Sequence, residues 1–114
     1  MKQNCLLFAY GLLQPEYSPP KTTVDHWPDQ IHGDLYDLGD YPGVINIGQS
    51  LNLVQGYVLE ICTSELAFLD EFEDVDSGEY RRILVKTIGG RSCWVYEYLF
   101  ELPKAAKPIA AWTK

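Results

Sequence analysis

Four carboxylates stand within five consecutive residues of the sequence, Asp70-Glu71-Phe72-Glu73-Asp74. A single carboxyl group can take a proton from one atom and return it to another when its pKa lies near the working pH. This requires an environment that disfavours the charged form, and most carboxylates at a protein surface do not have one. The chemistry available to the cluster therefore depends on which of its members is turned toward the core.

The spacing of apolar residues around the cluster predicts a short amphipathic helix over 64–72. Leu66, Leu69 and Phe72 recur at the intervals of one helical face. Glu73 lies four residues after Leu69 and seven after Leu66, so its side chain falls on the same face. Burial and the negative end of the helix dipole would both raise the pKa of this carboxyl. The alternative is a frayed helix end that leaves Glu73 solvated or bonded to a backbone amide, and the pattern alone does not decide.

Strands make up most of the remaining chain. Runs of apolar, aromatic and β-branched residues predict strands over 5–10, 31–38, 44–47, 54–61, 80–88 and 92–100. Gly89-Gly90 predicts a two-residue hairpin between the last two. The Pro-rich stretch 14–30 is expected to be irregular, with a helical turn at 23–27. Strands, one helix and a final hairpin indicate an α+β domain with a mixed or antiparallel sheet.

Length and composition describe one folded domain. The 114 residues are 46% hydrophobic and 22% charged, which is ordinary for a globular protein. We expect a domain over 1–102 and a C-terminal extension over 103–114, which either extends from the domain or is poorly ordered. The net charge of −7 would repel phosphate backbones and anionic lipids. Neither nucleic acid nor a membrane is therefore an expected partner.

Features of a membrane span or an export signal are missing from the sequence. The uncharged run 5–13 is about half of the roughly 20 residues that a membrane helix needs, and no small-residue cleavage site follows it. The three cysteines are an odd number at wide spacing, which predicts reduced thiols rather than a disulfide framework. A cytoplasmic protein is expected.

Motifs for several common chemistries are also missing. The chain has no Gly-rich phosphate loop, no HExxH, no GxSxG and no EF-hand pattern. His26 and His32 have no acidic or cysteine ligand at a suitable spacing, so a metal site is not expected there. No cofactor is expected either.

Three segments in a fixed order resemble the γ-glutamylcyclotransferase-like superfamily, which includes the AIG2-like and γ-glutamylaminecyclotransferase proteins. They are the strand and loop over 7–13, the LDEFE segment over 69–73, and the EYRR segment over 79–82. Gly56 in a middle strand and Val95-Tyr96 in the last strand match the family pattern as well. The resemblance covers residues 6 to 100, nearly the whole domain.

The resemblance implies a small mixed β-barrel with one short central helix and flanking helical turns. It also implies an enzyme that cyclises a γ-glutamyl amine or γ-glutamyl amino acid to 5-oxoproline and releases the free amine, without a metal or cofactor. The family's catalytic acid falls on Glu73, the residue that helical phase also singles out. One carboxyl is enough if it moves protons while the folded substrate supplies proximity.

The same resemblance assigns a substrate pocket. Its residues would be the loop Tyr10, Gly11, Leu12 and Leu13, which offers backbone amides, together with Tyr80 and Tyr96, which would line the pocket with their hydroxyls. The family usually carries Ser or Thr where this chain has Leu12, so a hydroxyl contact is lost there while backbone contacts can remain. Tyrosines that simply pack the core are the alternative interpretation of Tyr80 and Tyr96.

Two weaker features and one alternative function complete the expectations. The segment 41–44 resembles a rim of the family pocket, although a β-turn explains Pro42-Gly43 equally well. Arg82 resembles a residue that pairs with an acid, and an exposed pair of no consequence is the alternative. Because of Leu12 and the acidic surface, a non-catalytic module that binds a small molecule in the same pocket is the second candidate function. The leaving group of the substrate and the oligomeric state have no readable motif.

Overall fold

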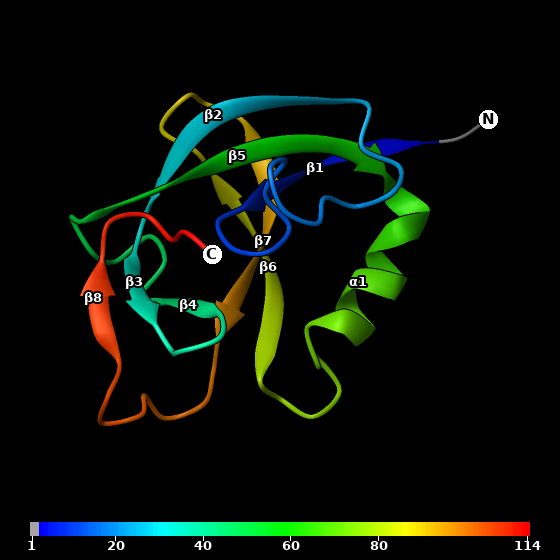
Figure 1. Ribbon diagram of the computed structural model, residues 1–114. Coiled ribbons are helices and arrows are strands. Elements are labelled where there is room, and N and C mark those ends of the chain that lie inside the picture. The colour runs from blue at the N-terminus through cyan, green and yellow to red at the C-terminus, as the bar shows by residue number, and fades with distance from the viewer. Residues whose placement is uncertain (1–2) are drawn as a thin grey trace.

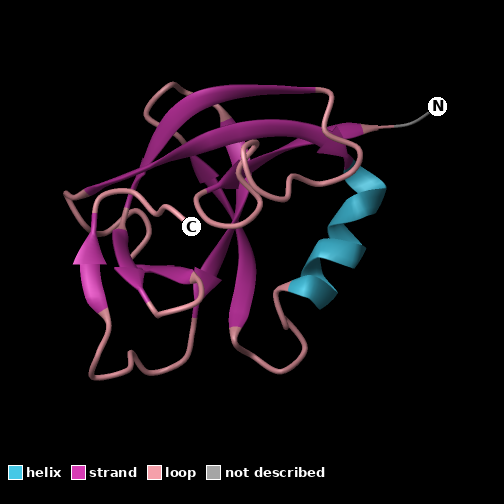
Figure 2. Cartoon of the chain, in the orientation of Figure 1, coloured by secondary structure: helices cyan, strands magenta, loops and turns pink. Residues whose placement is uncertain are grey.

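The computed structural model describes residues 3–114, which form eight strands and one short α-helix (Figure 1). The strands are β1 (Asn4–Ala9), β2 (Asp25–His32), β3 (Asp34–Asp37), β4 (Pro42–Ile45), β5 (Leu53–Cys62), β6 (Tyr80–Lys86), β7 (Ser92–Tyr98) and β8 (Lys107–Ile109). A 3₁₀ turn, η1 (Thr63–Glu65), leads into the helix α1 (Leu66–Phe72). The expected α+β class is confirmed (Figure 2).

The strands form two sheets. The larger has the order β2-β5-β1-β7-β6, and the smaller has the order β4-β3-β8. The larger sheet is mixed, because β1 runs antiparallel to β5 and parallel to β7. Within the described residues neither sheet closes on itself, so the expected barrel is wrong. The strand expected over 31–38 is instead divided at Gly33, where the chain leaves one sheet for the other and an added Cβ would lie 3.0 Å from Val44.

The central strand β1 has an apolar sequence because both of its faces are buried. Leu7 belongs to one core cluster, together with Leu66 and Leu69 of α1. Phe8 points the opposite way, into a second cluster that contains Ile31 and residues of the smaller sheet. The core therefore lies on both sides of β1, and α1 covers one of them.

The segment 14–30 differs from its expectation. A strand, β2, occupies Asp25–His32, so the helical turn expected at 23–27 is wrong. Pro28 lies opposite Tyr57 within this strand. A proline is tolerated there because β2 is an edge strand of the larger sheet and pairs with β5 alone.

The last residues of the chain pack against the rest of the fold. Strand β8 pairs antiparallel with β3. Beyond it, Trp112 is buried and contacts Tyr17 edge to face, with ring centroids 5.7 Å apart. The Gln14 side chain donates a hydrogen bond to the Trp112 carbonyl. The residues expected as an extension thus contribute a strand and a core side chain.

No helix among residues 3–114 combines the length and the apolar character that crossing a membrane requires.

Candidate active site

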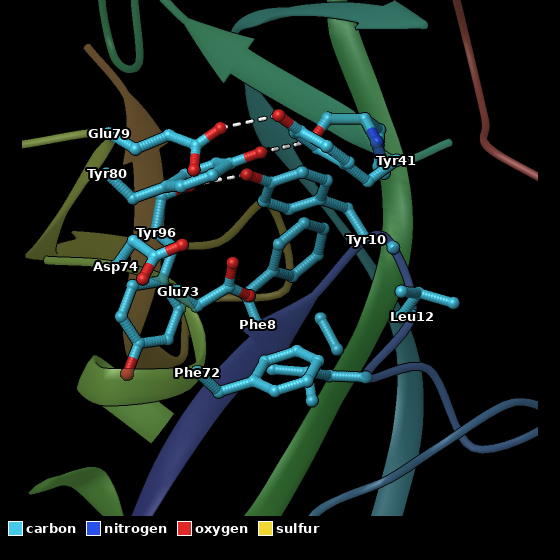
Figure 3. Close-up of a pocket in the computed structure, with 14 residues that line it drawn as sticks. Phe8, Tyr10, Leu12, Tyr41, Phe72, Glu73, Asp74, Glu79, Tyr80 and Tyr96 are labelled. Atoms are coloured by element: carbon cyan, nitrogen blue, oxygen red, sulfur yellow. Dashed lines mark hydrogen bonds between the residues drawn. The ribbon is translucent and has the colours of Figure 1, made fainter. Parts of the chain in front are cut away.

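A cavity of about 160 Å³ opens beside the C-terminal end of α1. The residues that the sequence assigned to a site all line it, and they are Tyr10, Gly11, Leu12, Leu13, Glu73, Tyr80 and Tyr96. They come from the loop after β1, the end of α1 and the strands β6 and β7 (Figure 3). The fold therefore gathers residues that lie up to 86 positions apart in the chain.

Glu73 is the residue that follows α1, and its side chain lines the cavity. Its amide still donates to the Leu69 carbonyl at 2.9 Å, so the helical turn that directs its side chain is intact. The carboxyl is half-buried, and none of the residues in 3–114 donates a hydrogen bond to it. Burial raises the pKa of Glu73 to about 7, and the nearby charges of Glu79 and Asp74 add to the effect. Such a carboxyl can both accept and donate a proton near neutral pH.

Asp70 lies one helical turn earlier and has the opposite surroundings. Arg82 donates to it from Nε at 2.8 Å and from Nη2 at 3.1 Å, and the Tyr96 hydroxyl donates at 2.8 Å. Although burial alone would raise the pKa of Asp70, these hydrogen bonds hold it below the ordinary value. The Arg82 guanidinium also lies 4.5 Å from the centre of the Trp94 ring. Arg82 therefore pairs with an acid, and that pair is partly buried rather than fully exposed.

The cavity tyrosines present their rings, because their hydroxyl protons are already used. Tyr10 donates to the Tyr96 carbonyl at 2.5 Å, and Tyr80 donates to the Pro42 carbonyl at 2.7 Å. The Tyr96 hydroxyl is turned to Asp70. Burial raises the pKa of Tyr10 and of Tyr80, so both stay neutral. Tyr80 and Tyr96 thus line the cavity and also pack the core, but their hydroxyls donate to protein acceptors instead of lining the pocket for a substrate.

The loop after β1 holds three backbone amides at the cavity wall. Within the described part of the chain, nothing accepts a hydrogen bond from the amides of Gly11, Leu12 or Leu13. Gly11 has no room for a side chain, because a Cβ would lie 2.8 Å from Cγ of Pro42. The loop can therefore approach β4 closely and still offer amide donors to a ligand.

Four further lining residues form the mouth of the cavity. Tyr41 and Phe72 are 38% and 52% exposed, and Asp74 is exposed beside them. The fourth, Glu79, accepts a hydrogen bond from the Tyr41 hydroxyl at 2.6 Å. This bond raises the pKa of Tyr41 to about 12.

The sequence carried only partial signals for these four residues. The segment 41–44 resembled a pocket rim, and Glu79 precedes Tyr80 in the EYRR segment. The β-turn considered for Pro42-Gly43 is wrong, because both residues pair with β3 as part of β4. Phe72 was expected on the buried face of the helix, and it is instead half-exposed at the cavity. Asp74 has a positive φ of 53°, which its sequence does not signal. The buried lining residues Phe8, Ala9 and Pro42 complete the wall.

Side chains that could hold a metal ion do not converge in the described residues. No group of three or more His, Cys, Asp or Glu side chains between residues 3 and 114 could hold a metal ion. His26 and His32 both lie on β2 and are exposed, away from the cavity lining. The polar groups that line the cavity include the Glu73 carboxyl and the backbone amides of the loop after β1.

Comparison with known proteins shows to which family the chain belongs. The family described as "Gamma-glutamyl cyclotransferase, AIG2-like" matches residues 7–113, which is nearly the whole chain. The chain belongs to this family. A Vibrio cholerae protein named "Putative gamma-glutamylcyclotransferase" is 39% identical over 101 residues, covering 82% of this chain and 81% of its own. Family membership is thereby shown, and the resemblance seen in the sequence is confirmed.

Solved structures share the fold of this γ-glutamyl cyclotransferase family member. The mouse AIG2-like protein has a TM-score of 0.71 at 19% identity and covers 97% of this chain and 89% of its own. The Escherichia coli protein ytfP has a TM-score of 0.69 at 29% identity and covers 93% and 92%. At 19% identity, the likeness to the mouse protein concerns the fold alone.

Proposed function

We propose that this protein is a γ-glutamyl cyclotransferase that converts a γ-glutamyl amine or γ-glutamyl amino acid into 5-oxoproline and a free amine. The observation that carries the proposal is Glu73, a carboxyl without a hydrogen-bond donor among residues 3–114, half-buried in a cavity and with its pKa raised to about 7. In this role Glu73 is the general acid and base. A small γ-glutamyl compound is the proposed partner, and a cytoplasmic location stays a prediction.

Proton bookkeeping explains why one carboxyl can serve the whole reaction. The α-ammonium of the substrate loses a proton to Glu73, and the resulting amine attacks the γ-carbonyl carbon of the same molecule. The same nitrogen, now part of the ring, then gives up a second proton to Glu73. Glu73 passes both protons in turn to the departing nitrogen as the bond between that nitrogen and the carbonyl carbon breaks. Glu73 starts and ends in the same protonation state. No outside acid, oxidant or cofactor is needed.

Substrate binding would come from the loop opposite Glu73. The amides of Gly11, Leu12 and Leu13 can donate to the α-carboxylate or to the oxygen that becomes negative during attack. The cavity is smaller than the roughly 300–1,000 Å³ of pockets for drug-sized ligands. It therefore suits the glutamyl group, with the leaving group at the mouth. The apolar Leu12 leaves recognition at that position to the backbone.

The test measures 5-oxoproline release from a panel that includes a γ-glutamyl-ε-lysine isopeptide, glutathione and simple γ-glutamyl amino acids. We expect turnover of at least one compound and a loss of about 10²–10⁴-fold in Glu73→Gln. The matched control is Glu71→Gln, which removes one exposed charge from the same helix end without touching the cavity.

Two results would contradict the proposal. Full 5-oxoproline release by Glu73→Gln would remove Glu73 from the mechanism. Silence of the whole panel with a folded protein that still binds the compounds would favour the second candidate, a binding module without catalysis.

A further inference from the structure

The mouth of the cavity has a distinct composition. Its exposed or half-exposed side chains are two aromatic rings, Tyr41 and Phe72, and two carboxylates, Asp74 and Glu79. We call these four residues the acidic rim. In Figure 3 its two carboxylates lie with Glu73 on one side of the cavity, and the Tyr10–Leu12 loop lies on the other.

Positive charge does not balance the acidic rim. The side chains that line the cavity include no lysine, arginine or histidine in the described part of the chain. The nearby Arg82 is held by Asp70 and lies over the Trp94 ring. A carboxylate on the leaving group would therefore meet negative charge at the mouth, whereas an ammonium group would meet carboxylates and two aromatic rings.

Asp74 belongs to the acidic rim because of the turn that ends α1. It takes a left-handed backbone conformation, with φ of 53°, immediately after the helix. Glycine, asparagine and aspartate adopt this conformation more readily than other residues. The side chain of Asp74 lines the cavity.

We propose that the acidic rim selects γ-glutamyl substrates whose leaving amine carries a second positive charge, such as a diamine or polyamine. Substrates that leave as an amino acid with a free carboxylate are disfavoured. This inference rests on the proposed cyclisation and narrows its substrate class. The glutamyl group is held at the loop amides, and the distal ammonium lies at Asp74 and Glu79.

Three γ-glutamyl compounds of matched length test the inference. Their leaving groups are 1,4-diaminobutane, with a terminal ammonium, pentylamine, with a terminal methyl, and 4-aminobutyrate, with a terminal carboxylate. We expect kcat/KM to fall in that order, by at least about tenfold between the first and the last, because exposed charge pairs are individually weak and several act together. The ratio should shrink as salt is added.

The variant that tests the rim is the double substitution Asp74→Asn and Glu79→Gln. Asparagine tolerates the left-handed conformation, and glutamine keeps an oxygen that can accept the Tyr41 hydrogen bond. The double variant should reduce the ratio to within about threefold of unity, since the exposed pairs that create it are gone. Using a ratio removes any change in overall rate that follows from the pKa of Glu73. The control Glu71→Gln removes a charge outside the cavity and should leave the ratio unchanged.

The outcomes separate the two proposals. Turnover with a flat or reversed charge order, or a ratio that persists in the double variant, overturns the selectivity and leaves the cyclisation standing. Failure of the folded wild-type protein to turn over any of the three compounds, or any member of the larger panel, overturns the cyclisation and the selectivity with it.

Discussion

Asp70 and Glu73 lie one helical turn apart at the end of α1, and their surroundings shift their pKa values in opposite directions. Asp70 accepts hydrogen bonds from Arg82 and Tyr96, and its pKa is lowered. Glu73 has no such donor among residues 3–114, lies in the cavity, and has its pKa raised to about 7. In the proposed mechanism, these two carboxylates would divide the roles of a fixed anion, Asp70, and a proton carrier, Glu73.

The difference arises from what faces each side of the helix end. Asp70 is turned toward β6 and β7, where long-range pairing brings Arg82 opposite Tyr96. Glu73 is turned toward a cavity whose nearest charges, Glu79 and Asp74, are also negative. Helical phase alone identifies Glu73 as a candidate, whereas the hydrogen-bond donors to Asp70 come from the strands of the sheet. Each of the following substitutions acts on one side of this comparison.

The largest expected effect is a loss of activity, and substitution of Glu73 should cause it whereas substitution of Asp70 should not. Glu73→Gln should lower kcat by at least about hundredfold, because the proton carrier is lost. Asp70→Asn should lower it by no more than about tenfold per folded molecule, because Asp70 only positions neighbouring groups. The measurement is 5-oxoproline release at equal concentrations of folded protein. Equal losses in the two variants would break the comparison.

The second effect is a loss of stability, and substitution of Asp70 should cause it. Asp70→Asn leaves the partly buried Arg82 without its charged partner, which should cost about 2 kcal/mol in the free energy of unfolding. Tyr96→Phe removes a single hydrogen bond to the same carboxylate and should cost about 1 kcal/mol. Urea denaturation measures both. A loss below about 0.5 kcal/mol in Asp70→Asn would place this pair with ordinary exposed ion pairs.

A smaller effect concerns how stability depends on pH. The pKa of Glu73 is raised from 4.5 in the unfolded chain to about 7 in the folded protein, so the folded state binds a proton more tightly. Wild-type stability should therefore fall as the pH rises from 4.5 through 7, since ionising a half-buried carboxyl costs free energy.

Glu73→Gln should escape this loss. Its advantage over the wild type should grow by about 1–2 kcal/mol between pH 5 and pH 8, a figure reduced for partial exposure. The check is urea denaturation of both proteins at each pH. A difference that does not change with pH would mean that Glu73 titrates as a solvated carboxylate.

The smallest effect sharpens the cause of the raised pKa. Glu79→Gln removes one of the neighbouring charges but leaves the burial of Glu73, which is the larger cause. The pKa of Glu73 should fall by less than about one unit, since like charges near a mouth are screened by water. The acidic limb of the kcat/KM profile would move to lower pH by that amount. A shift of the full distance to 4.5 would make charge, not burial, the main cause.

The parts of the fold that the sequence predicts are those that local patterns determine. The run through Leu7 and Phe8 predicts a buried strand, and Gly89-Gly90 predicts the hairpin between β6 and β7. The hairpin forms, but its connection spans residues 87–91, so the two-residue loop is wrong; Gly90 has a φ of 86° in it. The face of α1 that carries Leu66 and Leu69 is also local, so helical phase makes Glu73 a candidate for the core side of the helix, but only the tertiary structure decides that it enters a cavity.

The parts that the sequence does not predict depend on distant partners. Pro28 marks a loop by composition, and pairing with β5 makes it part of an edge strand. The tail forms β8 only because β3 is available beside it. In the same way, Phe72 fits the helical stripe, and the cavity leaves it at the rim instead of in the core. The acidic rim therefore emerges from tertiary structure rather than from a motif.

The most direct test of the central claim is a carboxyl NMR titration of Asp70 and Glu73 in the same wild-type sample, with Asp70→Asn and Glu73→Gln used to assign the two signals. The account predicts that Glu73 titrates near 7 and Asp70 below its ordinary 3.8, so that the two curves are separated by at least three pH units. If Glu73 instead titrates near 4.5, the carboxyl is not poised to carry protons at neutral pH, and the proposed role of Glu73 is contradicted.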